Sequence, residues 1–76
     1  GKMNEAIDSF TKSINLDGNN SDAYANRAIC YSYVNNKSKS NQDISIAVSK
    51  GAIESGIREA VRVIEEKRKK EKKKKN

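Results

Sequence analysis

Two sets of side chains in this 76-residue sequence could bind another molecule. The first set follows the spacing i, i+4, i+7 and i+11 and consists of Asp22, Asn26, Ile29 and Tyr33. On a helix this spacing places all four on one face, where a carboxylate, an amide and a phenol could hydrogen-bond a peptide beside an apolar side chain. This face either binds a protein or peptide partner or packs against another helix, which would be the fourth helix or a helix that precedes residue 1.

The second set is a basic run near the end of the chain, with eight Lys or Arg residues and one Glu. Its basic members are Lys67, Arg68, Lys69, Lys70, Lys72, Lys73, Lys74 and Lys75. The other residues hold eight basic and nine acidic side chains, so the formal net charge of +6 comes from this run. Such runs contact nucleic-acid phosphates, anionic lipid or acidic protein, or serve as nuclear import signals. With no aromatic residue between the charges, base stacking is not expected, and the alternative is a solvated segment with no specific partner.

Groups that usually carry catalysis are missing from the sequence. There is no His, which excludes Ser–His and Cys–His nucleophilic catalysis and the common zinc ligand sets. There is also no Gly-rich phosphate loop. We expect no enzymatic activity, no metal and no cofactor.

Compartment and membrane association are constrained only loosely. The single cysteine, Cys30, excludes an intrachain disulfide and is interpreted as a small buried apolar residue in a reducing compartment. No apolar run approaches the roughly 20 residues of a membrane span. We expect a cytoplasmic protein, with the nucleus as the alternative because of the basic run.

The elements that position these groups are predicted to be helices. Apolar residues at three- and four-residue spacing predict a first helix over about 2–16, which ends at Asp17–Asn20. Gly18 is expected to take the left-handed geometry that ends helices. A second helix covers about 21–34 and carries the predicted binding face.

The third and fourth helices follow the break at Asn35-Asn36. The third covers about 37–50, and its polar first half, Lys37–Gln42, is expected to be the most weakly held part of the fold. The fourth begins near 52 with one apolar stripe, made of Ile53, Ile57, Ala60, Val61 and Ile64. The stripe ends at Lys67, so we expect nothing to pack the basic run onto the rest of the chain.

A 34-residue periodicity links the first and third helices. Gly1, Ala6, Phe10 and Ser13 align with Asn35, Ser40, Ile44 and Ala47. Leu16-Asp17-Gly18-Asn19-Asn20 forms a turn after the first helix, and Tyr24, Ala28 and Tyr31 mark one face of the second. In these motifs the chain resembles the tetratricopeptide repeat family, with Gly18 in place of the usual Pro. The resemblance is good over 1–34, weak over 35–50, and ends near 51.

The resemblance implies an all-α fold of antiparallel helical hairpins from an α-solenoid, with about four helices and about one and a half repeats. Residues 1–66 would form the helical fragment, with a capping helix from about 52, and residues 67–76 a basic tail that is either an extended helix or disordered. The chain would open at the second helix of a repeat. It would then be a piece of a longer array, or an open array that self-associates.

The resemblance also implies function. Members of this family are non-catalytic scaffolds that bind a peptide or helix of a partner in a groove lined by the first helices of the repeats. In the members that bind acidic C-terminal peptides of heat-shock chaperones, an Asn at the place of Asn26 helps to clamp the terminal carboxylate. The alternative for Asn26 is a cap or a bridge between helices. A different function, a nucleic-acid or ribosome-associated adaptor, would act through the basic run.

Overall fold

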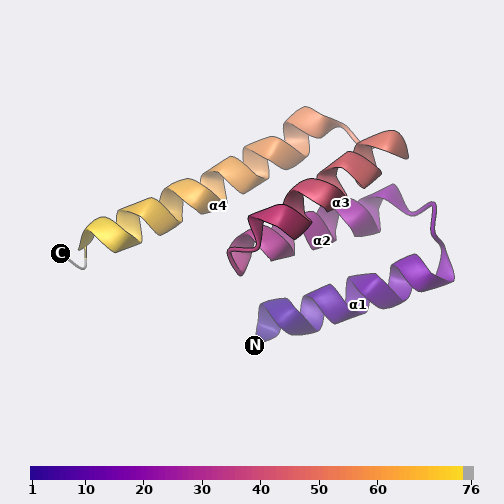
Figure 1. The fold of residues 1–76 in the computed structure, drawn as a ribbon, viewed down its shortest axis with the longest axis horizontal. Helices are drawn as coiled ribbons and strands as arrows, with labels where there is room; N and C mark the ends of the chain where they lie inside the picture. Colours follow the sequence, from indigo (N-terminus) through magenta and orange to yellow (C-terminus); the bar gives the residue numbers. More distant parts are fainter. Residues whose placement is uncertain (75–76) are drawn as a thin grey trace.

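The computed structural model describes the backbone of residues 1–74 and the side chains of residues 1–71. Its four helices are α1 (Lys2–Leu16), α2 (Ser21–Tyr33), α3 (Lys37–Ser49) and α4 (Glu54–Lys74). Successive helices run in opposite directions, so that α4 runs in the same direction as α2 (Figure 1). Within residues 1–74 there is no strand, and the predicted all-α class is confirmed.

The first turn forms differently from the prediction. Gly18 is not in the left-handed region, which is occupied among the described residues by Asn35, at φ 61°, and Gly51, at φ 109°. Instead, the backbone extends at Asp17, and its Oδ1 accepts a hydrogen bond from the backbone N–H of Asn19 at 3.0 Å. A side chain that bonds the backbone two residues on makes the turn, so the left-handed glycine is not needed.

Asparagine side chains start both middle helices. The Oδ1 of Asn20 accepts from the backbone N–H of Ala23 at 3.1 Å, and the Oδ1 of Asn36 accepts from Lys39 at 3.2 Å. Each satisfies one of the amide groups that a helix N-terminus leaves without a helical partner. The predicted break at Asn35-Asn36 is confirmed, because Asn35 takes the left-handed geometry and Asn36 caps α3.

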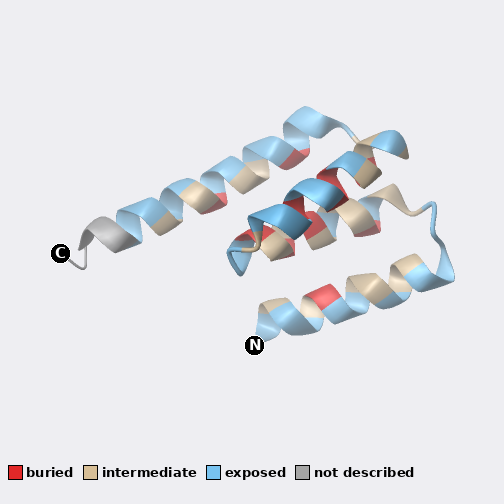
Figure 2. Ribbon diagram, viewed as in Figure 1, coloured by how far each residue is buried: buried red, intermediate tan, exposed pale blue. Residues whose placement is uncertain are grey.

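The core lies between α2, α3 and α4. Its buried members are Ala28, Ile44, Ala47 and Ile57. Figure 2 shows the buried positions of α4 on the side that faces α2 and α3. Because Ala28 and Ala47 are small, α2 and α3 approach closely, and the Ser40 hydroxyl donates to the Ala28 carbonyl at 2.8 Å. The first half of α3 is therefore held by a buried contact at Ser40, although its residues Lys37–Lys39, Asn41 and Gln42 are exposed.

The fourth helix begins two residues later than predicted. Gly51 turns the chain, the backbone N–H of Ala52 donates to the Ala47 carbonyl at 3.0 Å, and α4 starts at Glu54. Ala52 packs against the core, whereas Ile53 precedes the helix and is 75% exposed. The assignment of Ile53 to the buried stripe is wrong, because the stripe begins at Ile57.

The basic run is attached to the fold at Arg68. Its Nη2 donates to the carbonyl oxygens of Ser32, at 2.7 Å, and Tyr33, at 2.6 Å. Its Nη1 donates to the Asn35 side-chain oxygen at 3.4 Å. The last turn of α2 has no basic residue of its own, so this guanidinium meets the negative end of the α2 dipole. The expectation that nothing packs the run onto the rest of the chain is wrong.

Arg68→Met should lower the free energy of unfolding by about 1–2 kcal/mol, because the last carbonyls of α2 lose a charged donor. Urea denaturation followed by far-UV circular dichroism measures the change. Lys69→Met, at an exposed neighbouring position, serves as the matched control and should stay within about 0.5 kcal/mol of the parent. Equal effects of the two substitutions would show that Arg68 does not tie α4 to α2.

Candidate partner-binding seam between α2 and α4

Two depressions lie where α2 borders α4. The first has a volume of about 400 Å³ and lies at the start of both helices. It is lined by Ser21, Asp22, Ala25 and Ile29 of α2 and by Gly51, Ala52, Ile53, Gly56 and Ile57 from α4 and the turn before it. Most of this lining is apolar, and the strongly exposed Ile53 forms part of its rim.

The second depression lies at the end of α2. It has a volume of about 190 Å³ and is lined by Tyr33, Ile64, Lys67, Arg68 and Glu71. Tyr33 is 51% exposed here, so much of its ring faces solvent beside the exposed Lys67. This depression therefore combines an aromatic surface with charged groups.

The helical repeat places the residues between the depressions on the same side of the molecule. On α4, Gly56, Ala60, Val63 and Lys67 recur at spacings of four, three and four residues, and so share one face. On α2, Asp22, Asn26, Ile29 and Tyr33 share a face in the same way. We call these two rows together the α2–α4 seam.

The four residues predicted to bind a partner all lie along this seam. Asp22 and Ile29 line the first depression, Tyr33 lines the second, and Asn26 is exposed between them. Ile29 also packs against the core, so the alternative of packing against the fourth helix holds in part for this residue. The Asn26 side chain takes part in none of the hydrogen bonds found within residues 1–71, and its role as a clamp, cap or bridge stays a prediction.

Sequence reasoning missed the α4 half of the seam. Gly56 and Val63 were not singled out, although their spacing from Ala60 was visible in the sequence. The sequence does not show which side of α4 faces α2. That orientation depends on Ile57 and Ile64, which are buried. Gly56 lines the first depression and Lys67 the second, so the row that joins these two residues borders α2 at both ends.

A second missed group joins three helices on another side of α2. The Nε and Nη2 of Arg27 donate to the two carboxylate oxygens of Asp43 at 2.7 and 2.8 Å, and Nη1 donates to the Thr11 hydroxyl at 3.2 Å. The hydrogen bond to Asp43 raises the pKa of Arg27, although burial opposes the shift. The guanidinium also lies against the rings of Tyr24 and Tyr31. This cluster links α1, α2 and α3, and so holds α2, one wall of the seam, in place.

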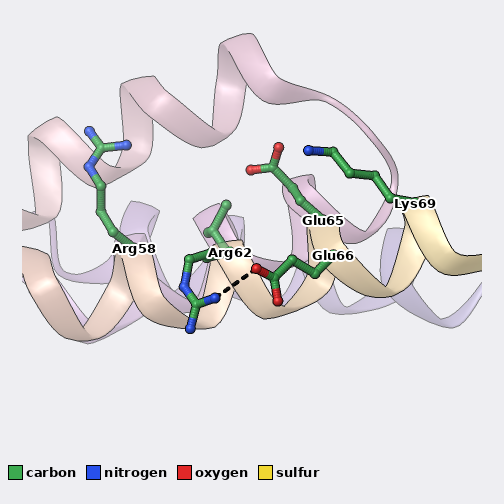
Figure 3. A pocket seen from close by; sticks show the side chains of 6 residues that line it. Arg58, Arg62, Glu65, Glu66 and Lys69 are labelled. Carbon is green, nitrogen blue, oxygen red and sulfur yellow. Dashed lines mark hydrogen bonds and ion pairs between the residues drawn. The ribbon is translucent and has the colours of Figure 1, made fainter.

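The outer face of α4 is charged. Arg62 pairs with Glu59. Figure 3 shows its second ion pair, with Glu66 at 2.8 Å. One 34-residue period earlier, the position of Arg62 is occupied by the fully buried Ala28. A large charged side chain on this face is unsuited to the close helix contact that Ala28 makes, so the outer face of α4 faces water instead.

The basic residues divide into distinct groups. Lys67, Lys69 and Lys70 are exposed, and the side chains of Lys72, Lys73, Lys74 and Lys75 lie outside the described part of the structure. Arg68 points back to the carbonyls of α2, so its assignment as an anion-binding residue is corrected: its donors already have partners.

Residues 9–45 match the family model described as tetratricopeptide repeat. The tetratricopeptide repeat expected from the sequence is confirmed over residues 9–45, as part of an array. The matched segment covers the second half of α1, all of α2 and most of α3. No curated protein and no solved structure matches the chain.

Repeats of this family generally mediate protein–protein interaction. Other chemistry finds little support in the described residues. Among residues 1–74, no three metal-ligating side chains come together, and no helix combines the length and apolar character needed to cross a bilayer. Cys30 is buried, and desolvation raises the pKa of its thiol, which makes it a poor nucleophile.

Proposed function

We propose that this tetratricopeptide repeat chain is a non-catalytic interaction module that binds a peptide or helix of a partner protein along the α2–α4 seam. The observation that carries the proposal is the set of exposed apolar side chains on this seam and in the turn before α4. Ile53 is 75% exposed, Tyr33 51% and Val63 40%. Exposed apolar groups beside a depression gain free energy when a partner covers them.

The seam favours recognition through side chains. Both of its walls are helices, whose backbone N–H and C=O groups are paired internally, so a partner cannot add a strand to them. An apolar helix face or the side chains of a short peptide can instead enter the depressions, as in other helix-in-groove complexes. The exposed Asn26 amide then supplies a hydrogen-bonding group midway along the contact.

The two alternative functions rest on fewer contacts. A nucleic-acid or ribosome-associated adaptor would use the whole basic run, of which Arg68 is turned toward α2. A binder of acidic C-terminal peptides of chaperones would clamp the terminal carboxylate with several side chains. Of these, the seam offers only the exposed Asn26. Neither alternative accounts for the exposed apolar residues on the seam.

The proposal predicts that Tyr33→Ala weakens peptide binding about tenfold, because a half-exposed aromatic side chain beside a depression is a typical binding hot spot. The affinity is measured by fluorescence anisotropy with a peptide selected from a random display library against the intact chain. Arg62→Ala, on the outer face of α4, is the control and should leave the affinity unchanged. Unchanged affinity in both Tyr33→Ala and Ile53→Ser, with the helical circular dichroism preserved, would remove the seam from the binding site.

A further inference from the structure

The α2–α4 seam differs in chemistry between its two ends. Asp22 borders the first depression, whose lining includes Ile29, Ile53 and Ile57. Lys67, Arg68 and Glu71 line the second, and the exposed Lys70 follows Lys67 on the same face of α4. The three basic side chains outnumber the Glu71 carboxylate, so this end carries a net positive charge. A partner that satisfies both ends needs an apolar group at the first depression and a negative charge at the second.

The distance between the two ends constrains the partner's conformation. Gly56 and Lys67 are eleven residues apart on α4, which is about 16 Å along the axis at roughly 1.5 Å per residue. Eleven residues make about three helical turns, so a partner helix presents residues i and i+11 on one face. An extended peptide covers the same distance in about five residues, and residues five apart in a strand point to opposite sides. The spacing therefore favours a helix.

The first depression also has room for a helix at close range. A Cβ added at Gly56 would meet no atom within 4 Å, so the space above this residue is open. Gly56 is exposed inside a helix, where glycine costs about 1 kcal/mol relative to alanine. This opening, beside the exposed Ile53, is where an aliphatic side chain of the partner would enter.

We propose, building on the function proposed above, that the seam binds an amphipathic helix that carries an aliphatic residue and, eleven residues away, an acidic residue. The aliphatic side chain occupies the depression at Ile29, Ile53 and Ile57, and the carboxylate pairs with Lys67. The pairing uses an internal Asp or Glu and needs no C-terminal carboxylate. A nucleic acid fits poorly, because the seam presents Asp22 and apolar groups where phosphates would lie.

The test selects binders from a display library of random 18-residue peptides against three versions of the intact chain: the parent, Lys67→Glu and Lys69→Glu. Lys69 lies about 200° around α4 from Lys67, so it serves as the matched charge control. Peptides enriched on the parent and on Lys69→Glu should share an aliphatic and an acidic residue at the spacing i, i+11. Peptides enriched on Lys67→Glu should carry Lys or Arg at the acidic position.

Binding constants of amide-capped synthetic peptides complete the test. Lys67→Glu should weaken a peptide selected on the parent about tenfold, and exchanging its acidic residue for Lys should restore the affinity. Gly56→Leu, which fills the first depression with the chain's own side chain, should weaken it at least as much. Loss of binding on amide capping would overturn the internal-acid assignment.

The outcomes separate this inference from the function on which it rests. If Gly56→Leu and Tyr33→Ala abolish binding, the seam is the binding site. If the selected peptides nevertheless share no acidic residue at the spacing i, i+11, the pattern of aliphatic and acidic residues inferred for the partner helix is wrong. If neither substitution affects binding, the proposed function itself fails. A concentration-dependent dimer in sedimentation that is lost in Gly56→Leu would make a second copy the occupant and would overturn the partner assignment.

Discussion

Asp43→Ala should destabilise the chain by about 3 kcal/mol, because it leaves a charged guanidinium without its carboxylate partner inside the fold. The Asp43 side chain is 4% exposed and that of Arg27 is 17% exposed. Arg27 keeps only the Thr11 hydroxyl and two tyrosine rings as neighbours once the carboxylate is removed. A chain of this size has a total stability on the order of 4–11 kcal/mol, so the loss is a large part of it.

Urea denaturation of the parent and of Asp43→Ala measures this loss. The double variant Arg27→Met, Asp43→Leu is the informative comparison, because two apolar side chains of similar size leave no buried charge and should recover most of the stability. A cost below about 1 kcal/mol for Asp43→Ala would show that Arg27 reaches solvent without penalty. A double variant as unstable as the single one would indicate that the hydrogen-bond geometry itself holds the three helices.

Ile44→Ala should cost about 3 kcal/mol, within the usual range for removing a buried aliphatic side chain. Ile44 is 1% exposed and packs with Ala28, Ala47 and Ile57, which come from three different helices. Its loss leaves a cavity that the small neighbouring side chains cannot fill. We expect α4 to be the first helix to separate, because it contacts the rest of the chain mainly through α2 and this core.

Thermal denaturation and amide hydrogen exchange check this prediction together. Ile53→Ala is the matched control, because Ile53 is 75% exposed and its truncation should change stability by less than about 0.5 kcal/mol. Ile44→Ala should accelerate exchange most in α4. Similar effects of the two substitutions would contradict the placement of the core between α2, α3 and α4.

The helices could be predicted from the sequence because their signals are local. Apolar periodicity and the breaks at Asp17–Asn20 and Asn35-Asn36 predicted the bounds of α1, α2 and α3 to within one residue. The start of α4 was missed because Ile53 fits the periodicity, while the turn at Gly51 keeps it outside the helix. Apolar periodicity alone cannot show whether such a residue lies in the helix or in the turn before it.

Contacts between distant residues could not be predicted in this way. Arg27 and Asp43 are sixteen residues apart, and Arg68 and Ser32 are thirty-six apart, so no helical spacing relates them. The α2 half of the seam was predicted because its four residues share one helix face. The α4 half depends on how the two helices pack, which is decided by the buried Ile57 and Ile64.

We propose that the seam between α2 and α4 binds the partner. Chemical-shift mapping by NMR, with a library-selected peptide titrated into the ¹⁵N-labelled intact chain, tests it most directly. We expect the largest shifts at Asp22, Asn26 and Tyr33 on α2, at Ile53 in the turn before α4, and at Gly56, Ala60, Val63 and Lys67 on α4. Largest shifts at Arg58 and Arg62 on the outer face of α4, or on α1, with the seam unchanged, would contradict it.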